Sequence, residues 1–452
     1  MAYFSSQTTS EEPSPASSPP TTPGDGSENG DAPHLSLNED TYQPLTLSTS
    51  SSSIILVIGG LGYIGSHTSL ELLKAGYNVV IVDSLSNSFE TAFARIKALA
   101  SKHYDGTNGT MPALCFHKLD YRSRAMRHLL EMYSIPTLQP PTTTGESPRL
   151  VRQSRIAGVI HFAAFKSVSE SIAKPIQYYQ NNVCGLVDFV ELLGQHNIRN
   201  LVFSSSATVY GSQADLGRPL REEDVVHHPE SYVDDAGSQC VAEPLVSGLR
   251  SPYARTKYFC EAILADIAYS DPAWRIVCLR YFNPIGCDPS GLLGEDPKGI
   301  PTNLFPVISQ VLTGVRKELD IFGTDWETRD GTPVRDFIHV SDVARGHVAA
   351  IGAKVDAPFR TFNLGSGSGT TVREAIRSLE ATSGKPIPVN CGSRRPGDVG
   401  FCVASNERAF LELGWSTKES ISQCARDLWN FVSRSESNPA KSIFGSVDTT
   451  AG

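Results

Sequence analysis

Short runs of apolar residues alternate along the chain with longer stretches in which apolar residues recur at helical spacing. Continuous apolar runs of this length are typical of parallel strands that are buried on both faces. The runs occupy residues 54–58, 78–82, 113–120, 158–164, 200–203 and 275–280, and the helical stretches occupy residues 89–101, 123–133, 172–195 and 251–269. Strands and helices in this order predict an α/β fold with a doubly wound parallel sheet.

The regular alternation weakens after residue 282, which predicts a second and smaller unit. We expect residues 54–282 to form the sheet domain, completed by residues 333–365. Residues 283–440 are expected to form mainly a C-terminal α/β cap over the carboxyl ends of the strands. Two stretches, near residues 136–154 and 231–249, are expected to be surface insertions.

Residues 1–53 differ from the rest of the chain in composition, because they are rich in Ser, Thr, Pro, Asp and Glu and contain almost no apolar cluster. Such a segment buries too little surface to offset the entropy lost on ordering, so we expect a disordered tail. It has neither the basic start nor the apolar stretch of a secretory signal.

Charge and cysteine content narrow the classes of function. The chain of 452 residues carries a formal net charge of −9 and shows no basic cluster. We therefore expect neither a nucleic acid nor a membrane as partner. Its nine cysteines are odd in number and show no metal-ligand spacing. We expect a reduced, cytoplasmic protein and no metal site.

The first apolar run leads directly into glycines. Gly59, Gly62 and Gly65 lie between this run and a helical pattern, an arrangement that lets backbone approach a pyrophosphate at a helix N-terminus. The next apolar run ends in Asp83, close to the spacing of a carboxylate that binds a ribose. Such a carboxylate repels a 2′-phosphate, so the pattern favours NAD over NADP. We interpret residues 54–282 as a Rossmann-like, NAD-binding domain.

Tyr253 and Lys257 form a Tyr-x-x-x-Lys pair, and among fifteen tyrosines only this one has a lysine four residues further on. Residues at this spacing share one face of a helix, and an adjacent cation is expected to lower the pKa of a phenol. Upstream, hydroxyl side chains that include Ser206 and Thr208 follow another apolar run. We expect them in the crevice where α/β sheets bind ligands.

With these residues in place, the chain resembles the extended short-chain dehydrogenase/reductase family, and within it the UDP-glucose 4-epimerases. The resemblance covers roughly residues 54–435. It is carried by GGLGYIGSHT (59–68), HFAAFKSVSES (161–171), SSSATVYG (204–211), SPYARTK (251–257), LRYFNPIG (279–286), GEDPKGIPTNL (294–304), VRDFIHVSDVA (334–344), NLGSG (363–367) and RRPGD (394–398).

The resemblance implies roles for individual residues. Tyr253 would be the catalytic base with Lys257 as its partner, and Ser206 and Thr208 would hold the sugar O4. The implied NAD contacts are Gly59, Gly62, Tyr63, Ile64, Gly65, Asp83, Asn87, Asp120, Tyr121, Phe162, Ala163, Lys166, Asn182, Tyr253, Lys257 and Phe282. The implied substrate contacts are Ser206, Tyr253, Asn283, Asn303, Phe322, Arg335, Arg395, Asp398 and Cys402.

The activity implied by the resemblance is a reversible 4-epimerisation of UDP-glucose and UDP-galactose through a 4-keto intermediate, with transient hydride transfer to bound NAD. It also implies a homodimer. Three alternatives stay open: a nucleotide-sugar 4,6-dehydratase, an epimerase of UDP-pentoses or UDP-uronic acids, and a non-enzymatic NAD-sensing protein of the same fold. The dehydratases carry an acid after the hydroxyl that follows the fifth strand, and none stands at residues 207–210 here.

Cys402 bears on the breadth of substrates. In the family, the residue four positions past the aspartate of RRPGD lies near C2 of the sugar, where tyrosine crowds an N-acetyl group. That aspartate is Asp398 here, so the position is Cys402. The small side chain implies that UDP-GlcNAc and UDP-GalNAc are also accepted. The alternative is that Cys402 is a small buried apolar residue without influence on specificity.

Overall fold

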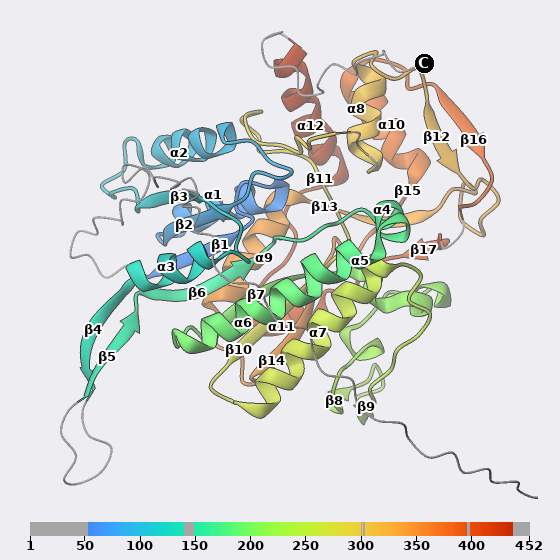
Figure 1. Ribbon diagram of the computed structural model, residues 1–452. Helices are drawn as coiled ribbons and strands as arrows, with labels where there is room; N and C mark the ends of the chain where they lie inside the picture. The colour runs from blue at the N-terminus through green and yellow to red at the C-terminus, as the bar shows by residue number, and fades with distance from the viewer. Residues whose placement is uncertain (1–52, 140–148, 300, 302, 396–397, 437–452) are drawn as a thin grey trace, which may run out of the picture. The chain divides into compact units, whose positions relative to one another are not determined.

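The structure is a computed structural model, and it describes residues 53–139, 149–299, 301, 303–395 and 398–436 (Figure 1). The predicted tail at residues 1–53 lies, except for Ser53, outside this part of the chain. The tip of the first predicted insertion lies outside it as well.

A parallel sheet of seven strands forms the centre of the fold. Its strands are β1 (Ile54–Ile58), β2 (Asn78–Asp83), β3 (Leu114–Lys118), β6 (Ile156–His161), β7 (Asn200–Ser206), β10 (Arg275–Tyr281) and β14 (Phe359–Leu364). They lie in the order β3-β2-β1-β6-β7-β10-β14. The direction of winding changes between β1 and β6, and ligands bind at such a switch point in doubly wound sheets. The predicted fold class is confirmed.

Helices cover both faces of this sheet, because successive strand residues point to opposite sides. Ile54, Leu56 and Ile58 of β1 pack with one layer of helices, while Ile55 and Val57 pack with the other. The first layer contains α3 (Arg124–Met132), α6 (Gly185–Gln195) and α7 (Pro252–Ser270). The second contains α1 (Tyr63–Lys74), α2 (Thr91–Tyr104) and α9 (Val340–Gly352).

The helical stretch expected at residues 172–195 is interrupted. It consists of α4 (Val168–Ala173), α5 (Pro175–Tyr178) and a π-helical turn (Tyr179–Cys184) ahead of α6. Pro175 lacks the N–H that a continuous helix needs, so α4 ends just before it. The π-helical turn packs against α7 and adjoins the cavity described below.

Both predicted insertions contain antiparallel hairpins. In the first, β4 (Ser134–Gln139) pairs with β5 (Arg149–Ser154), and in the second β8 (Glu230–Val233) pairs with β9 (Gln239–Ala242). Short 3₁₀ helices lie at Ala207–Leu216 and Glu222–Asp224.

The segments after β10 build a second apolar core. It contains side chains of α8 (Leu304–Leu312), β12 (Leu319–Phe322), α10 (Val372–Ser383) and α12 (Ile421–Glu436). Beside it, β13 (Val334–His339) pairs with β11 (Asn283–Ile285), β15 (Gly369–Thr371) and β17 (Phe401–Cys402), and β12 pairs with β16 (Val389–Gly392). Helix α11 (Glu407–Leu413) packs instead on β14 and α9. The division into an NAD-binding domain and a cap stays a prediction.

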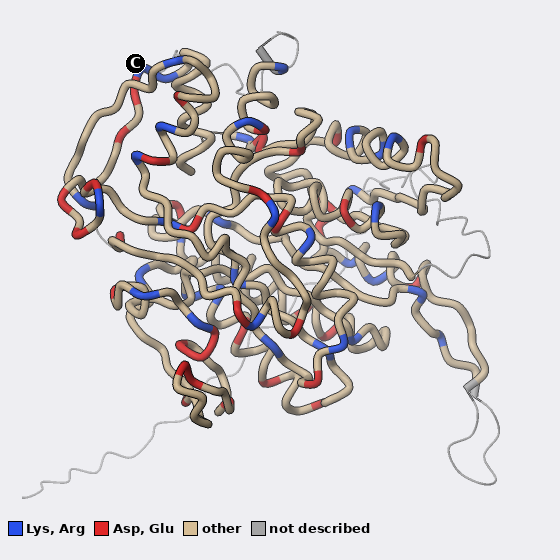
Figure 2. Tube along the Cα trace, turned by 180° about the vertical axis from the view of Figure 1, so that it is seen from behind, with Lys and Arg blue, Asp and Glu red and all other residues tan. Residues whose placement is uncertain are grey.

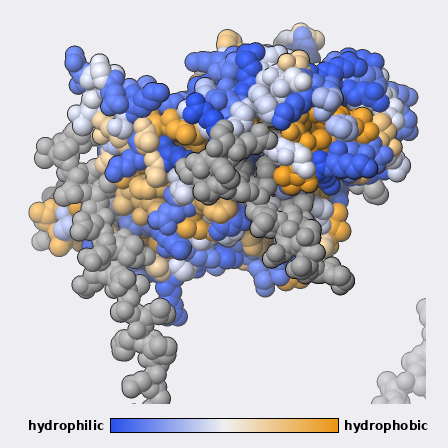
Figure 3. All heavy atoms as spheres, turned by 90° about the horizontal axis from the view of Figure 1, so that it is seen from above, coloured by the Kyte–Doolittle hydropathy of each residue, from blue (hydrophilic) through white to orange (hydrophobic). Residues whose placement is uncertain are grey.

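Charged residues of both signs are interspersed along the described chain (Figure 2). Seen from above, apolar residues gather in separate patches among hydrophilic ones (Figure 3). Among the helices within the described residues, none is long and apolar enough to cross a membrane.

Candidate active site

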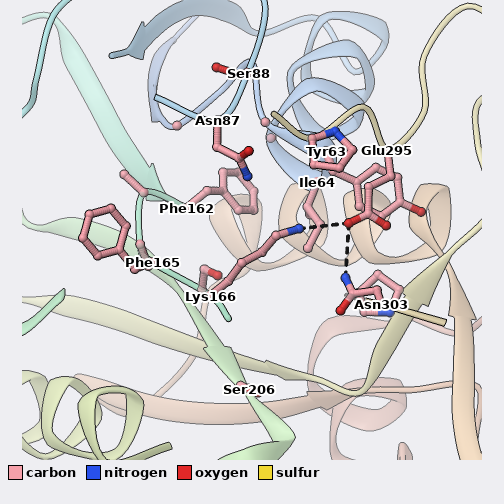
Figure 4. Close-up of a pocket in the computed structure, with 18 of the residues that line it drawn as sticks. Tyr63, Ile64, Asn87, Ser88, Phe162, Phe165, Lys166, Ser206, Glu295 and Asn303 are labelled. Carbon is pink, nitrogen blue, oxygen red and sulfur yellow. Dashed lines mark hydrogen bonds and ion pairs between the residues drawn. The ribbon is translucent and has the colours of Figure 1, made fainter. Parts of the chain in front are cut away.

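A cavity of about 610 Å³ opens at the carboxyl ends of the central strands. Its walls come from the segments that follow β1, β2, β3, β6, β7 and β10, from the start of α7, and from residues 295–297 and 303–306. Side chains far apart in the sequence therefore meet in one space, as Figure 4 shows for Asn87, Lys166, Ser206 and Asn303.

The glycine loop fits a pyrophosphate. Gly59 has φ +77°, and a Cβ there would lie 2.9 Å from the backbone nitrogen of Ala163. A Cβ at Gly65 would lie 2.2 Å from the carbonyl oxygen of Gly59. Helix α1 begins after Gly62 without a capping side chain and without an acid in its first turn. No side chain therefore caps the first N–H groups of α1 or offsets their partial positive charge. Free N–H groups at the edge of the cavity suit an anion.

Two carboxylates in the cavity lining, Asp83 and Asp296, suit the hydroxyls of a dinucleotide. Asp83 is buried at the end of β2 and accepts hydrogen bonds from the Leu61 and Leu85 amides at 3.0 and 2.8 Å. Asp296 also lines the cavity, and its Oδ1 is buried without a hydrogen-bond partner among the described residues. Burial raises the pKa of Asp296 to about 6. A buried acceptor of this kind calls for a donor from a ligand.

The start of α7 places the predicted base. The Ser251 hydroxyl accepts a hydrogen bond from the Ala254 amide at 3.1 Å, and Pro252 suits the first helical position. Tyr253 and Lys257 follow one turn apart, and both line the cavity. Local capping therefore fixes where the phenol enters the site.

Ser206 and Thr208 take different places at the end of β7. Ser206 lines the cavity wall together with Tyr253, and its hydroxyl acts to lower the pKa of the Tyr253 phenol. Thr208 does not line the cavity; its amide and hydroxyl donate to the Ser206 Oγ at 3.2 and 3.1 Å. Thr208 thus orients the Ser206 side chain, and its own donation leaves the Ser206 hydroxyl hydrogen free for another acceptor.

Burial dominates the electrostatics of this corner. It raises the pKa of Tyr253 to about 12, against the opposing effect of the Ser206 hydrogen bond. It also lowers the pKa of Lys257 to about 8. Lys257 Nζ donates to the Ser204 carbonyl at 2.5 Å and lies over the Phe203 ring. The phenol pKa is therefore raised in the chain alone, where the sequence predicted a lowered one, because burial dominates and Lys257 is not among the groups that shift it.

Most of the other predicted NAD contacts line the cavity. These are Tyr63, Ile64, Asn87, Asp120, Tyr121, Phe162, Ala163, Lys166 and Phe282. Asn182 does not. Its buried amide group accepts from the Phe165 amide at 2.8 Å and donates to the Phe165 carbonyl at 3.0 Å. Asn182 holds the loop after β6 in place, and that loop contributes Phe165 and Lys166 to the wall.

The predicted substrate residues fall into two groups. Asn283 and Asn303 line the cavity with Ser206 and Tyr253. The others lie outside its lining in a separate arginine cluster: Phe322, Arg335, Arg395, Asp398 and Cys402.

Within the arginine cluster, the charged groups bind one another. Arg335 Nη2 lies 2.8 Å from Asp398 Oδ1, and Arg395 Nη2 lies 3.4 Å from Asp398 Oδ2. The Arg395 guanidinium also lies over the Phe322 ring at 4.4 Å. Arg335 shares a face of β13 with Phe337, which lines the cavity.

Three buried or half-buried carboxylates near the site were missed in the sequence. Glu295 lines the cavity. Asp336 accepts hydrogen bonds from the backbone amides of Ser366, Gly367 and Ala404. Glu261 of α7 forms an ion pair with Arg280 and accepts a hydrogen bond from the Ser205 hydroxyl. Glu295 and Asp336 lie inside segments that carry the family resemblance, and Glu261 lies two turns after Tyr253. That spacing was the one available signal for Glu261.

Comparison with known proteins identifies the family. The NAD dependent epimerase/dehydratase family matches residues 55–365. The chain belongs to this family. The recognition made from the sequence motifs is confirmed, and the glycine loop, Asp83 and the Tyr/Lys pair all lie within the matched residues.

Characterised members of the NAD dependent epimerase/dehydratase family are similar to the chain over most of its length. UDP-glucose 4-epimerase 2 of Arabidopsis thaliana is 42% identical over 381 residues, which are 84% of this chain and 95% of the relative. UDP-glucose 4-epimerase of Bos taurus is 39% identical over 85% of this chain and 97% of its own length. A crystal structure of the Bifidobacterium longum UDP-glucose 4-epimerase with NAD⁺ and UDP has a TM-score of 0.70 at 37% identity, covering 87% of this chain and 100% of that one.

Proposed function

We propose that this chain interconverts UDP-glucose and UDP-galactose by inverting C4 of the sugar through a 4-keto intermediate, with NAD as a bound cofactor. The chain is an NAD-dependent enzyme of UDP-sugar epimerisation, as its relatives are. The proposal is carried by one observation: Ser206, Tyr253 and Lys257 line the same cavity as the glycine loop.

The site residues have distinct parts in this proposal. Tyr253 takes the proton of the sugar 4-hydroxyl and returns it after the sugar has turned about its link to UDP. Ser206 donates a hydrogen bond that favours the phenolate. Bound NAD would supply the acceptor and donor for the C4 hydride, and the positive charge of its oxidised ring would favour the phenolate further. Lys257 stays a cation at neutral pH beside it.

The remaining predicted substrate residues bind the nucleotide in this proposal. Asn283 and Asn303 line the cavity, and Arg335 and Arg395 suit a diphosphate because a planar guanidinium makes two parallel hydrogen bonds to it. The UDP anchor stays in place while the sugar turns. Binding energy far from C4 therefore keeps the reactive ketone in the site.

A coupled assay of UDP-galactose conversion to UDP-glucose tests the proposal. We expect turnover without added oxidant or reductant, because NAD is regenerated in each cycle. A panel with UDP-pentoses and UDP-uronic acids tests the main alternative. A structure similar to this chain, the Stenotrophomonas maltophila UDP-glucose-4-epimerase, was solved with a formylated UDP-arabinopyranose. Turnover of a pentose or uronic acid alone would replace our substrate assignment.

We further propose a homodimer built on the outer face of α4–α7. Ile172, Ile176, Val187 and Phe259 are exposed there, at 62%, 67%, 40% and 42%. Five apolar residues recur at helical spacing on this stretch and were candidates for core and interface together: Val183, Leu186, Val187, Val190 and Leu193. Of these, Leu186, Val190 and Leu193 lie in the core, and Val183 is partly buried against it. Sedimentation at micromolar concentration should give a dimer, and Phe259→Asp should shift it to the monomer. A wild-type monomer contradicts the proposal.

We also infer a cytoplasmic location. All nine cysteines lie within the described residues and are free thiols, which suits a reducing compartment. Cell fractionation with a tagged chain should recover the protein with cytosolic markers.

A further inference from the structure

Residues 294–299, which we term the strap, follow β11. They lie against the second apolar core, which includes Cys287 and Phe431. A Cβ at Gly294 would come within 2.7 Å of Cys287 Sγ and 2.8 Å of the Phe431 ring. The strap therefore begins tightly packed on buried side chains. Further along, Glu295, Asp296 and Pro297 line the cavity.

The first fastening of the strap lies on the β6 side. Lys166, from the loop after β6, reaches Glu295 with 3.0 Å between Nζ and Oε1 (Figure 4). Asn303 Nδ2 donates to the same Oε1 at 3.2 Å. The Glu295 carboxylate thus accepts from both neighbours inside the cavity, and its side chain is only 11% exposed.

The second fastening lies on the β2 side. Lys298 Nζ donates to the Leu85 carbonyl at 2.6 Å, and the Lys298 amide donates to Asn87 Oδ1 at 2.9 Å. The ammonium also lies 5.1 Å from the centre of the Phe89 ring. Leu85 has φ +57°, a strained conformation for a residue with a side chain. Asp83 maintains it through its hydrogen bond to the Leu85 amide.

Sheet order shows what the strap crosses. In the sheet, β1 lies between β6 and β2, so the glycine loop after β1 lies between the two loops to which the strap is fastened. A segment held by Lys166 on one side and by Leu85 and Asn87 on the other bridges the site of the pyrophosphate. Asp83, the carboxylate predicted to bind a ribose, precedes Leu85 of the second fastening by two residues.

We propose that the strap retains NAD in the site between turnovers, with Lys298 and Glu295 as its two fastenings. The inference rests on the proposed function, which reuses one NAD molecule in every cycle. Dissociation requires the strap to open, because residues 295–297 form part of the cavity wall. Lys298 and Glu295 are positioning residues for the cofactor and take no part in proton transfer.

The test measures the rate of NAD release rather than activity alone. The holoenzyme, loaded with excess NAD and freed of it by rapid gel filtration, is diluted into a scavenger of free NAD, and bound NAD is followed over time. Lys298→Ala and Glu295→Gln should each release NAD about tenfold faster, the factor expected for one charge-assisted hydrogen bond. With saturating NAD, kcat of Lys298→Ala should stay within about twofold.

Controls separate retention from general loosening. Lys354 is exposed in a loop before β14, so Lys354→Ala should release NAD at the wild-type rate. Added salt should speed release from wild type and have less effect on Glu295→Gln, because screening weakens the Lys166–Glu295 ion pair that this variant lacks. Thermal unfolding of the NAD-free variants checks that the fold is intact.

The outcomes are distinguishable. Wild-type release rates in both Lys298→Ala and Glu295→Gln overturn the strap while leaving the epimerase assignment intact. Equal acceleration in Lys354→Ala also overturns it, since that result reflects a general effect. A wild-type chain that binds no NAD under any loading removes the proposed function, and the strap with it.

Discussion

Secondary structure holds Ser206, Tyr253 and Lys257 in the corner of the cavity. In the arginine cluster, by contrast, ion pairs between the arginines and Asp398 hold the side chains. In the corner, a capped helix and a strand end bring a neutral hydroxyl to a neutral phenol. In the cluster, Arg335 and Arg395 both bind Asp398. On our proposal, a diphosphate would compete with this carboxylate for the same N–H groups.

The exposure of the two regions follows the same division. Lys257 is 3% exposed, whereas the Arg395 side chain is 58% exposed; the Arg335 and Asp398 side chains, at 17% and 18%, lie between these two. A buried contact changes little when ligand arrives, and an exposed ion pair rearranges readily because water stabilises the separated charges. Changes in the corner should therefore alter kcat, and changes in the cluster should alter KM.

The largest expected effect comes from the corner. Tyr253→Phe removes the proton acceptor and leaves the ring, so kcat should fall by ~10²–10⁴ with NAD binding retained. Tyr269→Phe, at the exposed end of the same helix, is the matched control and should leave kcat unchanged. Steady-state kinetics and the content of bound NAD check both. Near wild-type turnover of the Tyr253→Phe enzyme would end the assignment of Tyr253.

The cluster offers two neighbouring arginines with different partners. Arg395 binds Asp398 over Phe322, while Arg394 binds Asp325 over Trp326. Arg395→Ala should raise KM for the UDP-sugar about tenfold, because one charge-assisted hydrogen bond to phosphate is lost. Arg394→Ala should change KM less than about twofold. A loss of kcat without change in KM in Arg395→Ala contradicts the division between the two regions.

Cys402 tests the edge of the cluster that faces the sugar in the family. In the structure it pairs with Arg335 across β17 and β13 and does not line the main cavity. Wild type should epimerise UDP-GalNAc, and Cys402→Tyr should suppress this activity by about tenfold or more while sparing UDP-galactose. Cys402→Ser is the control of similar size. The prediction fails if wild type does not use the N-acetylated sugar or if tyrosine suppresses both substrates equally.

The smallest effect is expected outside both regions. Deletion of residues 1–50 should change neither kcat nor KM, since this segment has no residues from which to build a core. Activity, NAD content and thermal midpoint of the shortened chain provide the check. Loss of bound NAD on deletion would show that the tail contributes to the site.

Much of the fold could be predicted because its signals are local. The apolar runs and the helical spacing between them indicated the strands and helices of the central sheet, and the positions of Gly59, Gly62 and Gly65 indicated the turn into α1. The Tyr253–Lys257 spacing placed both side chains on one helix face. Each of these features depends on neighbours within a few residues, so the chain by itself determined them.

Tertiary structure decided what depends on distant partners. The pKa of Tyr253 rises because surrounding elements exclude water, an effect that no spacing along the chain contains. The Asn182 side chain accepts a hydrogen bond from the Phe165 amide, and Asp398 forms an ion pair with Arg335, because folding brings these groups together. Lys298 of the strap donates a hydrogen bond to Leu85, which lies 213 positions away in the sequence. Local sequence thus specified the chemical groups and their strand ends, while packing decided which of them meet and how strongly each is desolvated.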